Sequence, residues 1–324
     1  MVIGGASGFL GAHLVESFRA EGWRVATIGR AGADASWDDP AAILALVDGA
    51  DALIGLAGKS VDCRYADRNR DEVLRSRVDT TRALSRAIAA SARPPRVWLN
   101  ASTATIYRHA EDRAQGERDG ELGTGFSVDV ARNWERELFR DELPGTRRVA
   151  LRIAIVLGDG PATRTLFRLA RLGLGGPHLD GPWFPHRRYR GIGPDPSGPE
   201  RSGWHRSRGR QRFSWVHLDD VLGSIRWILD RDDLAGPINV ASPGASDSRG
   251  LMRALRQTVG ARVGLPASRW MLELGTWALR TESEMVLKSR WVRPEVLETS
   301  GYRFRWAELE PALRDVWASV RAGD

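Results

Sequence analysis

The sequence has almost no cysteine and almost no lysine. Cys63 is the one cysteine in 324 residues, so the chain cannot form an internal disulfide, and nothing indicates an oxidising compartment. No apolar run approaches the roughly 20 residues that cross a bilayer. The chain also does not open on the charged and apolar regions of a secretory signal. We therefore expect a cytoplasmic protein with no membrane segment.

The overall composition is that of an ordinary globular protein. Hydrophobic residues make up 42% of the chain and charged residues 27%. These proportions exclude wholesale disorder, a collagen-like repeat and a coiled-coil rod. The length is sufficient for one large α/β domain or for two modest ones.

Positive charge is concentrated in one segment. Lys59 and Lys288 are the two lysines, so arginine supplies 46 of the 48 basic residues. Between positions 186 and 212, eight arginines accompany two acids, which gives this segment +6 of the net charge of +7. Twelve of the 36 residues from 177 to 212 are Gly or Pro, without a helical or strand period. We therefore expect a disordered Arg/Gly/Pro-rich insertion at about 177–210.

A basic segment of this kind has two interpretations. It is typical of an arm that binds nucleic acid or an anionic surface. It is equally typical of an insertion tolerated between two elements of a finished fold. No RNA-binding aromatic motif and no DNA-binding helix accompanies the arginines. We therefore favour the insertion and do not predict a nucleic acid partner.

Apolar runs alternate with amphipathic stretches along the first 240 residues. This alternation, with short connections, is the pattern of a parallel, doubly wound sheet. After about residue 247 the chain is predicted to be mostly helical, with Trp270, Leu274 and Trp277 on one helical face. The predicted strands lie at 1–3, 24–28, 51–58, 96–100, 148–156, 213–217 and 237–240, and the predicted helices at about 9–22, 70–91, 126–140 and 219–229.

Three evenly spaced glycines follow the first predicted strand and open an amphipathic helix. Glycines at these places let the backbone turn tightly and approach a pyrophosphate, whose charge the helix N-terminus stabilises. The strand holds three residues, although a central parallel strand has about five or six, so we expect the natural strand to begin before Met1. The segment predicts a dinucleotide site that uses Gly5, Ser7, Gly8, Phe9, Leu10 and Gly11.

The end of the second predicted strand indicates which dinucleotide binds. An acid there would accept hydrogen bonds from the ribose 2′-hydroxyl, but this chain has Gly29 and Arg30. A guanidinium can pair with a 2′-phosphate by charge-assisted hydrogen bonds. We therefore predict NADP in preference to NAD. Because the chain is so rich in arginine, the alternative is that Arg30 is a surface residue with no role in cofactor binding.

Several sequence blocks resemble the extended short-chain dehydrogenase/reductase superfamily, also called NAD-dependent epimerases/dehydratases. The superfamily match rests on the glycine spacing and on the run NASTATIY at 100–107. A finer match is to the atypical "epimerase family" subgroup (39U-like), which has its own C-terminal domain. It rests on blocks at 51–58, 76–82 (SRVDTTR), 133–135 (NWE), 152–158 (RIAIVLG), 173–177, 211–220 (QRFSWVHLDD), 293–297 and 301–304.

The resemblance implies a Rossmann-like doubly wound parallel sheet with a smaller, mostly helical C-terminal substrate lobe. Residues 1–158 would form the NADP-binding domain, and 213–240 would return to it. Residues 159–212 and 241–324 would form the substrate lobe. The further cofactor contacts that it implies are Leu56, Ala57, Gly58, Arg77 and Ala101.

The catalytic residues of the superfamily are missing. Its members transfer a proton with a tyrosine whose pKa is lowered by a lysine four residues further on, on one helix face. Alignment through 134–135 places Ser127 and Ala131 at these two positions, and neither can do that chemistry. The resemblance gives Thr103 the role of orienting the substrate and makes Tyr107 the tyrosine of the strand-end motif.

His217 is a further candidate for moving the proton, because histidine titrates near neutral pH. The alternative is that it satisfies a backbone hydrogen bond. No histidine or cysteine spacing is typical of a metal site, so none is predicted.

We therefore expect an NADP-binding atypical short-chain dehydrogenase/reductase without the usual Tyr-x-x-x-Lys dyad. It would act as a nucleoside-diphosphate-sugar epimerase or an oxidoreductase on a small molecule that the sequence does not identify. The alternative is a non-catalytic NADP(H)-binding sensor or scaffold. The sequence does not indicate an oligomeric state.

Overall fold

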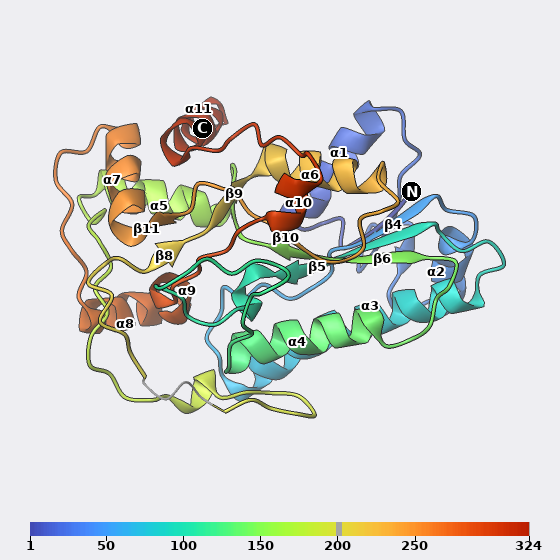
Figure 1. Ribbon diagram of the computed structural model, residues 1–324, viewed down its shortest axis with the longest axis horizontal. Coiled ribbons are helices and arrows are strands. Elements are labelled where there is room, and N and C mark those ends of the chain that lie inside the picture. The colour runs from blue at the N-terminus through green and yellow to red at the C-terminus, as the bar shows by residue number, and fades with distance from the viewer. Residues whose placement is uncertain (199–202, 324) are drawn as a thin grey trace.

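A seven-stranded sheet forms the centre of the computed structural model, which describes residues 1–198 and 203–323 (Figure 1). The strand order is β10-β6-β5-β4-β1-β2-β3, and each neighbouring pair is parallel. After β1 the chain adds strands on one side of the sheet (β2 and β3), and from β4 onward it adds them on the other side, so the strand order reverses between β1 and β4. In open α/β sheets, ligands bind at such a reversal. The strands are β1 Val2–Gly4, β2 Ala26–Gly29, β3 Ala35–Ser36, β4 Ala52–Gly55, β5 Val97–Thr103, β6 Arg147–Ile153 and β10 Gly236–Val240.

Helices cover both faces of this sheet. On one face lie α2 (Pro40–Val47), α3 (Asp67–Ala90) and α4 (Phe126–Phe139), and on the other lie α1 (Phe9–Ala20) and α6 (Leu218–Leu229) (Figure 1). Both faces are buried, which explains why the strands are nearly continuous apolar runs. Neighbouring strand residues alternate between two cores: Ile3, Ile54, Leu99 and Leu151 pack with α1 and α6, while Val2, Leu53, Trp98 and Ala150 pack with α2, α3 and α4.

Two predicted strands are interrupted where the chain changes partners. The predicted strand 148–156 ends as β6 at Ile153 and resumes as β7 (Ile155–Leu157). Ala154 N–H still donates to Val240 O in the main sheet, but Ile155 N–H donates to Ser214 O. The predicted strand 213–217 is likewise divided into β8 (Arg212–Phe213) and β9 (Trp215–His217). The pair β7–β9 thus forms a small parallel sheet of its own beside the main one.

The C-terminal part is mostly helical, as predicted. Helices α5, α7 and α11 pack around one apolar cluster (Figure 1). On α8, however, Trp270, Leu274 and Trp277 are 62%, 59% and 66% exposed, so the shared apolar face points to solvent. These elements are α5 (Pro161–Arg171), α7 (Ser248–Val259), α8 (Arg269–Ala278), α9 (Glu284–Leu287), α10 (Glu295–Thr299) and α11 (Leu309–Ala322), with short elements η1 (Ala104–Ile106), η2 (Arg187–Tyr189) and β11 (Ser246–Asp247).

The disorder that composition predicts for the basic insertion remains a prediction. Positions 199–202, with Glu200 and Arg201, lie outside the described residues. The described part of the insertion makes specific contacts, among them with Asp129 of α4, which is 1% exposed. The Asp129 carboxylate accepts hydrogen bonds from Ile192 N (3.0 Å), Ser197 N (2.7 Å) and Ser197 Oγ (2.6 Å). A buried carboxylate must be paired or hydrogen-bonded, and the insertion supplies these donors.

Within 1–198 and 203–323, no helix combines the length and the apolar character that a membrane crossing requires.

Candidate functional site

The three glycines of the first turn have different neighbours. Gly5 has φ +82°, and a Cβ there would lie 2.7 Å from Ala57 N. A Cβ at Gly11 would lie 2.4 Å from Gly5 O, so both positions require glycine for the chain's own packing. At Gly8 a Cβ would meet only Gly5 O, at 3.5 Å. The surface above Gly8 is therefore open, as the approach of a pyrophosphate requires.

The start of α1 is suited to an anion. Ser7 and Gly8 are exposed, and no side chain caps the helix, which begins at Phe9. The first-turn N–H groups of an uncapped helix, together with the helix dipole, bind phosphate. The predicted residues of this segment therefore lie together at one anion-binding turn.

A groove of about 610 Å³ runs from this turn along α1 to the end of β2. Arg30 lines it, and so does Arg19, which the sequence analysis did not select. One carboxylate, that of Glu16, lines it as well. The pairing of Arg30 with a 2′-phosphate remains a prediction. Helical spacing could have identified Arg19 as a groove residue, because α1 presents one face to the groove. The residues of that face are Ala12, Val15, Glu16 and Arg19.

The loop after β4 meets the glycine turn at the point of strand reversal. Leu56 N–H donates to Gly4 O at 2.8 Å, and Ala57 is the residue that a side chain at position 5 would strike. Leu56 and Ala57 therefore lie next to the glycine turn, and their contact with a cofactor remains a prediction. Ala101 lies on the neighbouring strand β5 and is 8% exposed.

Arg77 supports this loop. Its Nη1 donates to Lys59 O (3.0 Å) and to Val73 O (2.9 Å), and its guanidinium lies 5.0 Å from the Trp134 ring centroid. Burial lowers the pKa of Arg77 to about 10. A Cβ at Gly58 would lie 3.0 Å from Arg77 Cζ, so glycine is needed for this close contact. The predicted cofactor contact of Arg77 remains a prediction.

Thr103 and Tyr107 lie at the carboxyl end of β5. Thr103 Oγ1 accepts a hydrogen bond from Thr105 N at 3.1 Å and so caps η1. Tyr107 is 2% exposed, donates from its hydroxyl to Asn239 Oδ1 (2.9 Å) and accepts from Arg152 Nη1 (2.9 Å). Its hydroxyl is thus committed to a buried network, and burial raises its pKa.

The two positions of the missing dyad have different surroundings. Ser127 lies on the first turn of α4, and its hydroxyl donates to Glu284 Oε2 at 3.0 Å. Ala131 is fully buried in an apolar cluster with Tyr107 and Val292, which leaves no room for a lysine. Glu284 was missed by the sequence analysis because it is 157 residues from Ser127.

A cavity of about 100 Å³ opens beside Glu284. The basic insertion and the C-terminal lobe supply most of its wall, and the segment before α4 supplies the rest. Its lining residues are His109, Thr124, Gly125, Asp180, Phe184, Pro185, His186, Tyr189, Gly203, Trp204, His205, Arg269, Glu284, Leu287 and Lys288.

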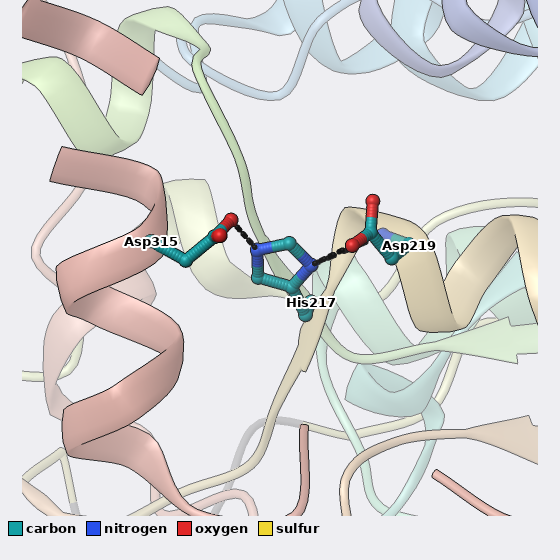
Figure 2. Close-up of side chains that lie close together, drawn as sticks. All are labelled: His217, Asp219 and Asp315. Atoms are coloured by element: carbon teal, nitrogen blue, oxygen red, sulfur yellow. Dashed lines mark hydrogen bonds and ion pairs between the residues drawn. The ribbon is translucent and has the colours of Figure 1, made fainter. Parts of the chain in front are cut away.

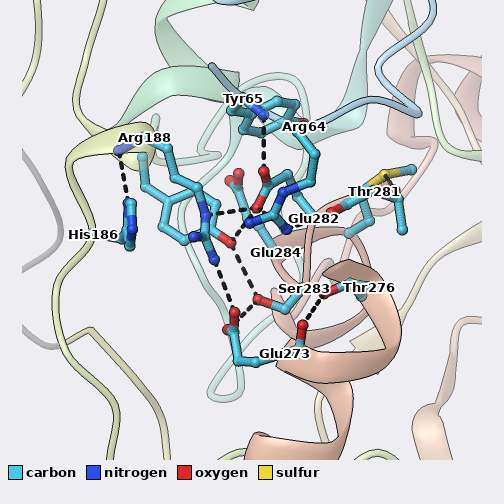
Figure 3. Close-up of polar contacts among 12 residues, drawn as sticks. Arg64, Tyr65, His186, Arg188, Glu273, Thr276, Thr281, Glu282, Ser283 and Glu284 are labelled. Carbon is cyan, nitrogen blue, oxygen red and sulfur yellow. Dashed lines mark hydrogen bonds and ion pairs between the residues drawn. The ribbon is translucent and has the colours of Figure 1, made fainter. Parts of the chain in front are cut away.

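A buried network ties the insertion to the loop before α3 and to the C-terminal lobe (Figure 3). Glu282 is fully buried, and its carboxylate accepts from Tyr65 N (2.8 Å) and from the Tyr189 hydroxyl (2.8 Å). Arg188 reaches Glu282 Oε2 at 2.7 Å and donates to Glu273 Oε2 at 2.8 Å. Burial raises the pKa of Tyr189 above its ordinary value, and Glu282 adds to this effect.

His217 lies between two carboxylates (Figure 2). It is 4% exposed, and its Nδ1 accepts from Asp219 N at 3.1 Å and so caps α6. Its Nε2 is 3.3 Å from Asp315 Oδ2, a partner that the sequence analysis missed. Burial lowers the pKa of His217, while Asp219 and Asp315 oppose this shift.

The same three residues could be considered as metal ligands. Asp219 and Asp315, however, face different nitrogens of the ring (Figure 2). One ion could not contact the ring and both carboxylates without rearrangement. The observed contacts are those of a helix cap at Nδ1 and of a carboxylate near Nε2. The catalytic role of His217 remains a prediction.

Comparison with known proteins agrees with this architecture. Residues 1–164 match the NAD dependent epimerase/dehydratase family, and residues 267–316 match DUF1731, a domain of unknown function. The chain is 30% identical over 335 residues to epimerase family protein SDR39U1 of Bos taurus, with 98% of this chain and 99% of that protein covered. It is 26% identical over 323 residues to epimerase family protein YfhF of Bacillus subtilis (strain 168), with 97% and 96% covered.

Solved structures show the same relationship. The crystal structure of human epimerase family protein SDR39U1 with NADPH has a TM-score of 0.79 at 25% identity and covers 97% of this chain and 98% of that one. Thermus thermophilus UDP-glucose 4-epimerase, solved with NAD, shares the fold, with a TM-score of 0.70 at 16% identity over 100% and 99% of the chains. The predicted resemblance and Rossmann-like fold are confirmed, and the chain belongs to the NAD dependent epimerase/dehydratase family.

Proposed function

We propose that this protein binds NADP(H) and acts as an atypical oxidoreductase or epimerase on a small molecule. The observation that carries the proposal is the glycine turn. At Gly5 and Gly11 the chain's own backbone occupies the space that a side chain would need, whereas Gly8 faces open space. The nicotinamide, when bound, supplies or accepts a hydride. SDR39U1, the human relative solved with NADPH, supports the choice of NADP.

Each part of the cofactor has residues suited to it. The exposed turn at Ser7 and Gly8 would hold the pyrophosphate through backbone N–H groups. Arg30 and Arg19 would pair with the 2′-phosphate in the groove beside α1. The nicotinamide half would then lie over the loop 56–58, Ala101 and Thr103, at the carboxyl edge of β4 and β5.

The substrate side belongs to the second part of the chain. We propose the predicted division, with 159–212 and 241–324 as the substrate lobe, because the cavity is lined mainly from these ranges. A small carbonyl or hydroxyl compound, or a sugar nucleotide like those of the solved epimerases, would have Thr103 to orient it. The cytoplasmic location remains a prediction.

The alternative function is a non-catalytic NADP(H) sensor or scaffold. It is favoured by Ser127 and Ala131 at the dyad positions, since neither side chain can replace the acid–base pair. Screening of carbonyl compounds separates the two functions. An enzyme consumes NADPH, whereas a sensor binds it without turnover and captures different partners in the NADP and NADPH states.

Substitution Arg30→Asp tests the choice of cofactor. A charge-assisted hydrogen bond is worth about 1.5–3 kcal/mol, so we expect NADPH affinity to fall about 10- to 100-fold, with NADH affinity changed less than about threefold. Isothermal titration calorimetry measures both. Arg24→Asp is the matched control, because it makes the same charge change at an exposed residue outside the groove. An equal loss for both dinucleotides would contradict the assignment.

A further inference from the structure

Ser127, at the position of the missing tyrosine, contacts an acid from a distant part of the chain. Its hydroxyl donates to Glu284 Oε2 at 3.0 Å, at the start of α9. A tyrosine at position 127 would extend past the hydroxyl position of serine, toward the place where this carboxylate lies. The acidic group of the site is therefore supplied across the interface between α4 and the C-terminal lobe.

Arg290 lies near this acid. Its Nη1 donates to the carbonyl of Met285, the residue after Glu284, at 2.9 Å, and its Nε donates to Thr105 Oγ1 at 3.1 Å. Desolvation lowers the pKa of the Arg290 guanidinium, and Glu284 opposes this shift. Arg290 thus brings a positive charge into the neighbourhood of Glu284, as the lysine does for the tyrosine in the superfamily.

Arg290 is joined to the predicted substrate-orienting residue. Thr105, which accepts from Arg290, donates its N–H to Thr103 Oγ1 at 3.1 Å. Thr103 ends β5, and ligands of doubly wound sheets bind at these carboxyl ends. The segment that carries Glu284 and Arg290 is therefore tied to the ligand side of the sheet.

Glu284 also has access to a ligand. It is half-buried and lines the cavity of about 100 Å³. The wall opposite includes aromatic side chains of the insertion, Phe184 and Trp204 among them. A carboxyl group in such a place can exchange a proton with a small molecule in the cavity and afterwards with solvent.

The neighbouring phenol is less suited to this role. Tyr65 is 4% exposed and near Ser127, and burial raises its pKa, an effect to which Glu284 adds. The superfamily's chemistry needs a phenol whose pKa is lowered instead. The Tyr107 hydroxyl is engaged elsewhere, with Asn239 and Arg152, and His217 Nδ1 accepts from the Asp219 N–H.

We propose that Glu284 is the acid–base residue of the substrate site, oriented by Ser127. In the reducing direction, a hydride adds to the carbonyl carbon of an aldehyde or ketone, and the π pair of the C=O bond moves to oxygen. The protonated carboxyl of Glu284 gives its proton to that oxygen and becomes a carboxylate. In the oxidising direction, the carboxylate takes the hydroxyl proton as the hydride leaves the carbon. This inference rests on the proposed function.

The full chain with NADPH and para-nitrobenzaldehyde as the probe tests the proposal. We expect Glu284→Gln to lower kcat by about 100-fold or more, the scale of general acid–base catalysis, and to remove one limb of the pH profile of kcat/KM. NADPH affinity, measured by calorimetry, should change less than about threefold, because Glu284 is placed on the substrate side. Glu310→Gln, at an exposed glutamate of α11, is the matched control.

Three results would overturn the inference: a Glu284→Gln rate within about threefold of the wild type, an unchanged pH profile, or loss of turnover in Tyr65→Phe alone. NADPH binding without consumption of the probe would also overturn it and would favour the sensor. A wild-type chain that binds no NADPH would instead contradict the proposed function itself.

Discussion

Gly8 and Gly11 lie three residues apart on the same turn, but of the two the structure itself requires glycine at Gly11. A Cβ at Gly11 would also lie 2.7 Å from Ala6 Cα, so the start of α1 can rest on the turn only without a side chain. Gly8 has φ −77° and ψ 167°, a conformation that any residue adopts, and no nearby atom excludes a Cβ. We propose that position 8 lacks a side chain because a ligand approaches there.

The two alanine variants should therefore behave differently. Gly8→Ala should leave the free energy of unfolding within about 0.5 kcal/mol of the wild type and weaken NADPH binding about tenfold or more, because the methyl group occupies the pyrophosphate's approach. Gly11→Ala should destabilise the fold by about 1–3 kcal/mol through overpacking. Chemical denaturation and calorimetry measure both quantities. Equal destabilisation by the two variants would contradict this assignment of roles.

At the scale of elements, the composition of the insertion does not show which of its side chains are buried. Its Arg188 is turned inward, to Glu273 and Glu282, while the neighbouring Arg187 is exposed. The face of α8 shows the reverse, since an apolar stripe at helical spacing points to solvent. In both cases the element's surroundings, and not its residue types, decide which side chains are buried.

Arg188→Met should loosen the insertion. The change leaves the fully buried carboxylate of Glu282 with fewer cations, although Arg64 remains 3.5 Å from it. Removing one partner of a buried ion pair costs about 3 kcal/mol or more. We expect lower thermal stability and faster hydrogen exchange in 184–198, measured by mass spectrometry. Arg187→Met is the matched control, and an equal effect of both variants would show that the network does not hold the insertion.

On the scale of the whole molecule, His178 joins three distant parts of the chain. Its N–H donates to Ser248 Oγ at 3.1 Å, its carbonyl accepts from Gln211 Nε2 at 3.0 Å, and it forms a bridge with Ala267. Burial of its imidazole lowers the pKa of His178 from 6.5 to about 4. The folded protein therefore binds this proton less readily than the unfolded chain does.

This difference predicts a pH dependence of stability. At pH values between the unfolded pKa of 6.5 and the folded pKa of about 4, His178 is protonated in the unfolded chain and neutral in the folded protein. Each pH unit of acidification therefore removes about 1.4 kcal/mol of folding free energy through this residue. Urea denaturation of the wild type and of His178→Gln at several pH values measures the effect. The variant should have the shallower slope over this range, and identical slopes would refute the assignment.

Local patterns were sufficient for the sheet except β3, for its covering helices except α2, and for the glycine turn. The alternation of apolar runs and amphipathic stretches is a property of neighbouring residues, and so is the spacing of Gly5, Gly8 and Gly11. The interrupted strands were not predictable, because Ile155 leaves the main sheet for Ser214, a residue with no local relation to it. Arg19 could have been found from helical spacing along α1.

The sequence by itself determined the fold class, the family and the dinucleotide turn, because each depends on residues a few positions apart. Only the tertiary structure decided which distant groups meet: Ser127 with Glu284, Arg290 with Thr105, and His217 with Asp315. These contacts join the first part of the chain to its C-terminal lobe. Their partners are set by how the helices and loops pack against one another, and no periodicity or motif along the chain records that packing.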